Sequence, residues 1–265
     1  MKKHNEVIFF LGIFLFLNSC GEFISSPYIS KTKNRNLNGH NLNQITSRSG
    51  NFTNTFKIAV LSDTHDYYSE LAKQVDYINK HSDEIAFVLH TGDATNLGML
   101  VEWEMFKGFI DKLKVPFMMV IGNHDMLTRG VDIYSQMFGD DLNFSFAFKQ
   151  TRFIFINNNN WESHGTAPDL DYLESELSSA SETNKIILGH VQPDDSARYS
   201  KTQISQMENL VNTYNVNYFI NGHNHNYGSG PFGNATRVTV GSPVKDKILI
   251  LSISDGGVSH SHINY

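Results

Sequence analysis

The chain has 265 residues, 40% of them hydrophobic, and a formal net charge of −6 at pH 7. This length and apolar content are enough for one domain with a full-sized core, so a second domain is not needed. The sequence contains no block of like charges and no long Lys/Arg run, which argues against nucleic-acid binding through a general basic surface.

The first segment of the chain has the pattern of an export signal. Lys2 and Lys3 precede an apolar run at residues 7–17, VIFFLGIFLFL. A helix that spans a bilayer needs about 20 such residues, so this run is too short and fits the core of a secretory signal. The run ends in Leu17-Asn18-Ser19-Cys20, which resembles the bacterial lipobox, although the residue at the place of Asn18 is usually smaller or less polar.

The lipobox resemblance implies that residues 1–19 are a lipoprotein signal peptide and that Cys20 carries a diacylglycerol. The mature protein would then be exported and anchored to the bacterial cell envelope, at the inner or the outer membrane. A cleaved signal with an incidental cysteine and a short uncleaved anchor are the two alternatives. Because Cys20 is the only cysteine, the chain has no internal disulfide.

Residues 20–55 are predicted to be a flexible polar tether that leads to the folded domain at residues 56–265. The segment is rich in Asn, Ser, Thr, Gly and Lys, and it carries few large apolar residues. Its central part, residues 31–49, shows no clear hydrophobic period. Such a composition does not bury enough apolar surface to offset the entropy of folding.

Strands and helices are predicted to alternate from Lys57 onward. Apolar, β-prone runs predict strands at residues 57–61, 85–89, 116–121, 144–148, 152–157, 185–188, 216–220, 236–240 and 247–253. Apolar residues at helical spacing predict helices around residues 71–78, 100–113, 170–177 and 204–211. Strands dominate after about residue 215, which predicts an α/β protein with two stacked sheets flanked by helices.

Five of the predicted strands end in short segments that carry Asp, Asn or His. They are Asp63-Thr64-His65, Gly92-Asp93, Gly122-Asn123-His124-Asp125, Gly189-His190 and Gly222-His223-Asn224-His225. Ligands of open α/β sheets bind beyond the carboxyl ends of the strands, so these segments are expected to meet. Their side chains bind divalent or trivalent metals through oxygen and imidazole nitrogen. One such segment alone is common in turns and helix caps, whereas all five in this order predict a metal site.

Together the five segments resemble the signature of the calcineurin-like metallophosphoesterase superfamily, over about residues 56–226. The resemblance implies a four-layer α/β/β/α sandwich of two mixed sheets flanked by helices. It also implies two metal ions. One ion would be held by Asp63, His65 and His225, the other by Asn123, His190 and His223, and Asp93 would bridge the two.

The same resemblance implies a catalytic role for His124 and Asp125. His124 would face the substrate without binding metal, and Asp125 would orient it. The reaction would be hydrolysis of a phosphate monoester or diester by metal-activated water. Asn96 stands where purple acid phosphatases carry a tyrosine, three residues after Asp93, which argues against a tyrosinate–iron site. Mn, Fe and Zn all suit the ligands, and the substrate and oligomeric state stay open.

Two alternatives belong to other classes of protein. A catalytically inactive binding lipoprotein could have the same fold, but the complete ligand set and His124 argue against it. A metallo-β-lactamase-like hydrolase is the third possibility. The His-x-His-x-Asp-His cluster of that family is absent from the sequence, which argues against this class.

Several further residues have both a functional and an ordinary interpretation. His260 and His262 alternate in a predicted C-terminal strand and so share one face. They could form a third metal site, but a solvated strand is the favoured interpretation. Trp161, His164 and Arg129 lie in two predicted loops, around residue 161 and at residues 128–138, that could border the cleft. The sequence allows two interpretations of these three residues: contact with the substrate, or an ordinary position on the surface.

Overall fold

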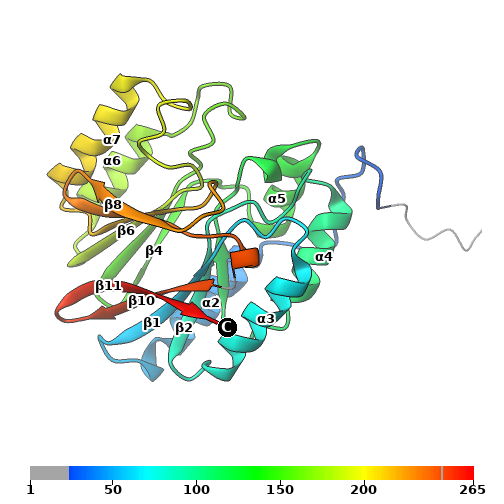
Figure 1. Cartoon of the computed structure of the whole chain (residues 1–265), viewed down its shortest axis with the longest axis horizontal. Coiled ribbons are helices and arrows are strands. Elements are labelled where there is room, and N and C mark those ends of the chain that lie inside the picture. Colours follow the sequence, from blue (N-terminus) through cyan, green and yellow to red (C-terminus); the bar gives the residue numbers. More distant parts are fainter. Residues whose placement is uncertain (1–23, 246) are drawn as a thin grey trace, which may run out of the picture.

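Two β-sheets packed against each other form the centre of the molecule, and helices cover their outer faces (Figure 1). The computed structural model describes residues 24–245 and 247–265. The signal peptide expected at residues 1–19 and Cys20 lie outside the described residues. The architecture is the four-layer α/β/β/α sandwich that the sequence predicts.

The first sheet has five strands in the order β11-β10-β1-β2-β3. Its members are β1 (Phe56–Leu61), β2 (Ile85–His90), β3 (Phe117–Met119), β10 (Lys247–Ser254) and β11 (Gly257–Asn264). β1, β2 and β3 run parallel, so their carboxyl ends meet at one edge of the sheet. β10 and β11 extend the sheet in antiparallel fashion beyond β1.

The second sheet has six strands in the order β4-β5-β6-β7-β9-β8. Its members are β4 (Phe144–Phe148), β5 (Thr151–Phe155), β6 (Asn184–Leu188), β7 (Tyr218–Asn221), β8 (Gly228–Phe232) and β9 (Ala235–Thr239). The four inner strands are parallel, while β4 and β8 are antiparallel edge strands. The sequence does not predict β8, because GSGPF has no alternating apolar pattern, and Pro231 is tolerated only because the strand lies at an edge.

Helices form the two outer layers (Figure 1). The first sheet is covered by α3 (Tyr68–Lys80), α4 (Leu100–Ile110) and α5 (Gly130–Phe138), and the second by α6 (Leu170–Ser179) and α7 (Lys201–Thr213). α5 occupies a segment for which the sequence predicts a loop. It is a helix because Ile133, Tyr134, Met137 and Phe138 lie at helical spacing and are buried together.

Aromatic side chains fill the layer between the two sheets. Phe87 from β2 makes edge-to-face contacts with Phe146, Phe148 and Phe153 of the second sheet, at ring-centroid distances of 5.7, 5.3 and 5.4 Å. Such pairs add to the stabilisation that burial of the rings provides. This core fixes the two sheets relative to each other and so fixes the strand ends that carry the polar segments.

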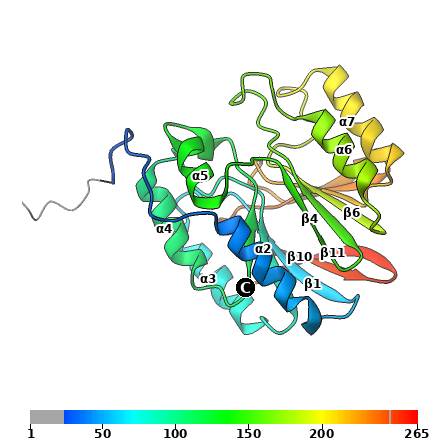
Figure 2. The ribbon, with the colours of Figure 1, turned by 180° about the vertical axis from the view of Figure 1, so that it is seen from behind.

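The expectation of a flexible tether is wrong for the part nearest the domain. Residues Leu37–Arg48 form helix α2, followed by a short 3₁₀ helix at Ser49–Asn51 (Figure 2). Ile45 is 1% exposed and belongs to the core between the sheets. The Thr32 hydroxyl donates to Glu104 on α4 over 2.8 Å. Tertiary contacts rather than an amphipathic pattern hold this helix, which is why no period is visible in its sequence.

Among residues 24–245 and 247–265, no helix has the length and apolar character needed to cross a bilayer.

Candidate metal centre

The five polar segments meet where β1, β2 and β3 of one sheet and β6 and β7 of the other end. Their ligand-type side chains form two groups, and within each group the ligand atoms lie within 4.8 Å of one another. The first group is Asp63, His65, Asp93 and His225, and the second contains Asp93, His190 and His223. Asp93 belongs to both groups, so its carboxylate lies between two places where a cation would fit.

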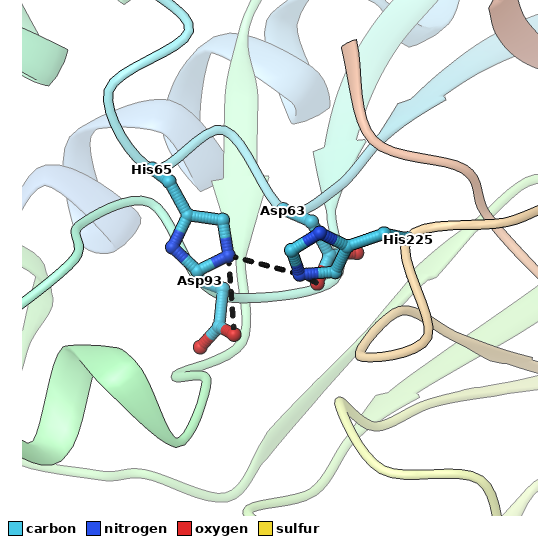
Figure 3. Close-up of side chains that lie close together, drawn as sticks. All are labelled: Asp63, His65, Asp93 and His225. Atoms are coloured by element: carbon cyan, nitrogen blue, oxygen red, sulfur yellow. Dashed lines mark hydrogen bonds and ion pairs between the residues drawn. The ribbon is translucent and has the colours of Figure 1, made fainter. Parts of the chain in front are cut away.

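The first group brings two imidazoles and two carboxylates together (Figure 3). Nε2 of His65 lies 3.2 Å from Nε2 of His225. The same His65 nitrogen is 3.6 Å from Oδ2 of Asp93, and the His225 nitrogen is 3.7 Å from Oδ1 of Asp63. Nitrogen and oxygen atoms that converge in this way suit a shared cation.

The second group has an amide oxygen at its centre. Oδ1 of Asn123 lies 2.9 Å from Nε2 of His190 and 2.9 Å from Nδ1 of His223. Oδ2 of Asp93 is 3.2 Å from the same His190 nitrogen. His190 donates its other ring hydrogen, on Nδ1, to the Thr91 carbonyl over 2.8 Å, which leaves Nε2 free as a ligand atom. The structure therefore brings together all seven side chains that the resemblance names as ligands.

The backbone is strained at most of these positions. Five of the seven residues have positive φ: Asp63 at 47°, His65 at 46°, Asp93 at 57°, His223 at 72° and His225 at 56°. Such conformations are unfavourable for residues other than glycine and persist only where their surroundings fix them. Here the Asp63 amide donates to the Gly92 carbonyl over 3.0 Å, and the His65 amide to the Asp93 carbonyl over 3.1 Å.

Two glycines allow the loops to approach one another closely. A Cβ atom on Gly122 would lie 2.1 Å from the backbone nitrogen of Asp93. A Cβ atom on Gly222 would lie 2.0 Å from Oγ of Ser62 and 2.6 Å from Oδ2 of Asp63. Any side chain at either position would push apart the loops that carry the ligands.

The buried charges of the centre shift one another's ionisation. Burial raises the pKa of Asp63 to about 7. Burial also acts to raise the pKa of Asp93, but His190 and His65 outweigh it and hold that pKa below its usual range. Burial acts to lower the pKa of His190, yet Asp93 and Asp63 outweigh it and raise the pKa to about 9. The carboxylates thus need positive charge beside them, which protons or metal cations can provide.

Asp125 does not orient His124, contrary to the sequence-based expectation. Its buried carboxylate accepts hydrogen bonds from the backbone amides of Gly122, Ala94 and Thr95, at 3.0, 3.2 and 2.9 Å, and from the Thr95 hydroxyl at 2.9 Å. Burial raises the pKa of this carboxyl to about 7. Asp125 therefore ties together the two loops that carry Asp93 and Asn123, because adjacent side chains of a short 3₁₀ turn point in different directions.

His124 lies beside the first group without belonging to it. Its Nδ1 donates to the Asn96 carbonyl over 2.7 Å, so this backbone oxygen orients the ring. The ring is nearly perpendicular to that of His65, with centroids 4.8 Å apart. Its Nε2 is left for contact with a bound molecule. The sequence alone could not reveal the Asn96 contact, since a carbonyl partner carries no signature in the residue type.

His260 and His262 lie on β11, an edge strand with no buried residue, as the favoured interpretation of a solvated strand predicts, and both also contact tyrosines. The two ring nitrogens of His260 lie 3.0 Å from the Tyr218 hydroxyl and 3.2 Å from the Tyr227 hydroxyl. The His262 ring packs edge-on against Tyr227, with centroids 3.5 Å apart. In the part of the chain that the structure describes, ligand-type side chains form no third metal group.

The structure places one further residue, which the sequence does not predict, beside the second group of ligand atoms. Arg198 lies in the loop between β6 and α7 and contacts Glu162, Trp161 and His223. No motif surrounds it in the sequence, so only the fold reveals its position. Of the other loop residues considered, Arg129 forms a surface ion pair with Asp132.

The sequence matches the family of calcineurin-like phosphoesterases over residues 56–227. No curated protein matches the chain. Several solved structures share its fold. A purple acid phosphatase from seeds of yellow lupin (Lupinus luteus) superposes with a TM-score of 0.65 at 15% identity, over 81% of this chain and 52% of the lupin chain. This chain thus spans about half the length of the lupin protein.

Two further structures superpose over similar shares of this chain. GAP50, the anchor in the inner membrane complex of Plasmodium, has a TM-score of 0.62 at 15% identity, over 79% of this chain and 84% of its own. A dimetal phosphatase from Danio rerio has a TM-score of 0.59 at 13% identity, over 79% of this chain and 99% of its own. At these identities the likeness concerns the fold.

Proposed function

Because this chain belongs to the calcineurin-like phosphoesterase family, we propose that it hydrolyses phosphate esters at a centre of two metal ions. The observation that carries the proposal is the carboxylate of Asp93, which belongs to both groups of ligand atoms. A bridging carboxylate is what a pair of cations needs, since its negative charge lowers the repulsion between them.

The donor set fits such a pair of ions. Nε2 of His65 and Nε2 of His225 face each other at 3.2 Å, where a cation between them could accept both lone pairs. In the proposed assignment, Asp63, His65 and His225 hold one ion, and Asn123, His190 and His223 hold the other. Imidazole, carboxylate and amide ligands suit Mn, Fe and Zn. Two bound ions would supply an activated water and neutralise charge on the phosphoryl group.

The remaining residues of the centre have separate proposed tasks. Asn123 contributes a neutral oxygen, which limits the negative charge of the ligand set. His124, oriented by the Asn96 carbonyl, would donate a proton from Nε2 to the leaving alkoxide. Asp125 would hold the loops of Asp93 and Asn123 at their working distance through its four hydrogen bonds.

An activity and metal screen tests this proposal. We expect the purified full chain to hydrolyse a nitrophenyl phosphate monoester or diester, to lose activity on chelation and to regain it with Mn²⁺, Zn²⁺ or iron. Metal uptake without turnover of either ester would favour the alternative of a catalytically inactive binding protein. The screen also distinguishes a monoesterase from a diesterase, for which the geometry favours neither.

We also propose that the enzyme is anchored to the cell envelope through a lipid on Cys20. The support is the apolar run at residues 7–17 that ends in the lipobox-like segment before this cysteine. Mass spectrometry of the protein from its membrane fraction should find a diacylglycerol on an N-terminal Cys20. An unmodified Cys20, or cleavage at another residue, would contradict the proposal.

A further inference from the structure

Three side chains form a cluster beside the His223 side of the metal centre, here called the rim cluster: Trp161, Glu162 and Arg198. Nη1 of Arg198 lies 3.0 and 2.9 Å from the two carboxylate oxygens of Glu162. The guanidinium carbon is 4.2 Å from the centre of the Trp161 ring. Nη2 reaches to 3.5 Å from Nε2 of His223. The guanidinium is therefore held on two sides and directed at a proposed metal ligand.

The two loops that carry the rim cluster are tied to the strand ends of the centre. The buried Asn158 side chain accepts hydrogen bonds from the amides of His190, at 2.7 Å, and Val191, at 3.0 Å. The Tyr199 hydroxyl, next to Arg198, donates to the Asn158 carbonyl. Both loops thus share one anchor, which itself holds the segment of His190.

A second buried asparagine ties the Trp161 loop to the other sheet. Nδ2 of Asn159 donates to the carbonyl of Ile121 over 2.9 Å, just before the segment of Asn123. The Trp161 side chain is nevertheless 55% exposed. The indole is therefore exposed although hydrogen bonds of Asn158 and Asn159 hold its loop in place.

The direction of the ring nitrogens makes the space between Arg198 and His223 suitable for an anionic oxygen. Nδ1 of His223 faces Asn123 and the second ligand group, while Nε2 faces Arg198. When Nδ1 is a metal ligand, Nε2 carries the hydrogen. The Nε2–H group of His223 and the Nη2–H groups of Arg198 are then all hydrogen-bond donors. Neither residue can accept a hydrogen bond from the other. A phosphoryl oxygen placed between them would accept from both.

Exposed apolar side chains also occur close to the ligand segments in the sequence. Three of the exposed large apolar residues lie within four residues of a proposed ligand or of Asp125: Leu97, Leu127 and Tyr227. Leu97 follows Asp93 by four residues, and Tyr227 follows His225 by two. Exposed apolar groups gathered around a polar site indicate a ligand with an apolar part. Among the exposed large apolar residues that the structure describes, Trp161 is the one whose ring is stacked on a cation, and an exposed indole favours an aromatic partner.

We propose that Arg198, held by Glu162, binds a phosphoryl oxygen of the substrate and that Trp161 stacks on an aromatic ring in the substrate's alcohol. The substrate class is therefore phosphate esters whose organic group carries an aromatic ring close to the ester. This inference rests on the proposed phosphoesterase function and deepens it. Glu162 acts only through Arg198 and is a positioning residue.

The arginine is tested first, with inorganic phosphate as the probe. In the metal-loaded full chain, Arg198→Ala should weaken phosphate binding, measured by calorimetry, by about 10- to 100-fold, the range for a hydrogen bond to a charged group. Arg198→Lys should recover part of this loss, because the charge is kept without the forked geometry. Glu162→Gln should weaken binding less than Arg198→Ala and be silent in the Arg198→Ala background. Metal content should stay unchanged in all of them.

The matched control is Arg152→Ala. Arg152 also pairs with a glutamate, at 3.1 Å from Glu182, but it lies at the opposite end of β5 from the centre. This variant should bind phosphate like the wild type. Unchanged phosphate binding in Arg198→Ala, with both metals present, would overturn the role of the arginine. An equal loss in Arg152→Ala would overturn it as well, since the effect would then be a general one.

The tryptophan is tested with two esters of similar size and reactivity, benzyl phosphate and cyclohexylmethyl phosphate. Trp161→Leu should lower kcat/KM for the benzyl ester by about tenfold more than for the cyclohexylmethyl ester, and Trp161→Phe should keep most of the preference. Fluorescence gives a readout that needs no turnover. The only other tryptophan, Trp103, is 0% exposed, so quenching by benzyl phosphate would report on Trp161.

Failure of this inference is distinct from failure of the proposed function. A wild-type enzyme that hydrolyses both esters with equal kcat/KM, and whose fluorescence benzyl phosphate leaves unchanged, would contradict the aromatic subsite while the phosphoesterase stands. A chain that turns over neither of these monoesters nor a nitrophenyl phosphate diester would contradict the proposed function. Even then, two results would support an aromatic phosphate ligand: phosphate binding that weakens in Arg198→Ala, and quenching of Trp161 fluorescence by benzyl phosphate. If neither result were found, the rim cluster would not be a binding site.

Discussion

The candidate metal centre has two regions that are built on different physical principles. One is the ligand floor, formed by the seven proposed metal ligands Asp63, His65, Asp93, Asn123, His190, His223 and His225, and the other is the rim cluster beside it. The floor is largely buried, and five of its residues have positive φ. The rim cluster lies on loops fixed by asparagine side chains, and its Trp161 is 55% exposed. We therefore expect substitutions in the floor to be poorly tolerated, and substitutions in the rim cluster to change which ester is bound.

The largest expected effect comes from the residue that joins the two halves of the floor. Asp93→Asn removes the charge shared by both ligand groups, so we expect both metals to bind more weakly and activity to be nearly abolished. Elemental analysis and a rate measurement on the same sample check this. The matching rim variant, Trp161→Leu, should keep both metals. Full activity of Asp93→Asn would contradict the proposal that two metal ions share the Asp93 carboxylate.

His124 should affect the reaction without affecting the metals. Loss of its proton should cost about 10²–10⁴ in rate on alkyl phosphate esters, the usual range for general acid catalysis. The cost should be clearly smaller on nitrophenyl esters, whose leaving group departs without a proton. Rates of His124→Ala on both ester types, with metal content measured in parallel, test this. Lost metal would show that His124 belongs to the floor, and equal losses on both esters would point to charge stabilisation instead.

The close packing of the floor predicts a large stability difference between two glycine variants. Gly122→Ala places a Cβ atom 2.1 Å from the Asp93 backbone, so the free energy of unfolding should fall by about 3 kcal/mol. Gly108→Ala, on α4 with open space around it, should raise it by about 0.5–1 kcal/mol. Denaturant unfolding of both variants measures the difference. Similar stabilities would mean that the loops of the floor are less tightly packed than described.

Acid should reduce the stability of the protein through a buried histidine next to the floor rather than through the rim cluster. Burial lowers the pKa of this residue, His90, to about 3. Its ring nitrogens lie 3.0 Å from the Thr64 hydroxyl and 3.2 Å from the Gly92 amide nitrogen. The unfolded state takes up this proton near pH 6.5, so the contribution of His90 is present above that pH and is lost as the pH falls towards 3.

The corresponding experiment compares the metal-free wild type with His90→Gln. Between pH 7 and pH 4.5 the stability difference between them should narrow by about 2.5 kcal/mol, which follows from 1.36 kcal/mol per pKa unit over the two units below the unfolded pKa of 6.5. Trp161→Leu should show no such narrowing against the wild type. Parallel curves for wild type and His90→Gln would contradict the picture of a neutral, buried imidazole.

The floor could be predicted from the sequence because each ligand follows a buried strand within a few residues. The carboxyl ends of parallel strands meet at one edge of a sheet, so Asp, Asn and His residues that directly follow such strands must lie close together. The rim could not be predicted, because Arg198 and Glu162 are 36 residues apart and only the packing of two loops brings them together. The run Asn157–Asn160 was visible, but its role as an anchor was not.

Helix α2 and the contacts of Asp125 were missed for related reasons. α2 buries Ile45 fully but presents mostly polar residues, so its fold depends on partners far along the chain. Asp125 adjoins His124 in sequence, yet its carboxylate contacts the backbone of two other loops. Local patterns show which residues end a strand, and they do not show which tertiary partner a side chain selects.

Diffraction at the absorption edge of the bound metal, on crystals of the metal-loaded chain, tests whether two ions share the Asp93 carboxylate. Two anomalous peaks are expected, about 3.5–4 Å apart, the spacing of two-metal hydrolytic sites. The Asp93 carboxylate should lie between them, with Asp63, His65 and His225 around one peak and Asn123, His190 and His223 around the other. A single peak, or two peaks that do not share Asp93, would contradict this arrangement.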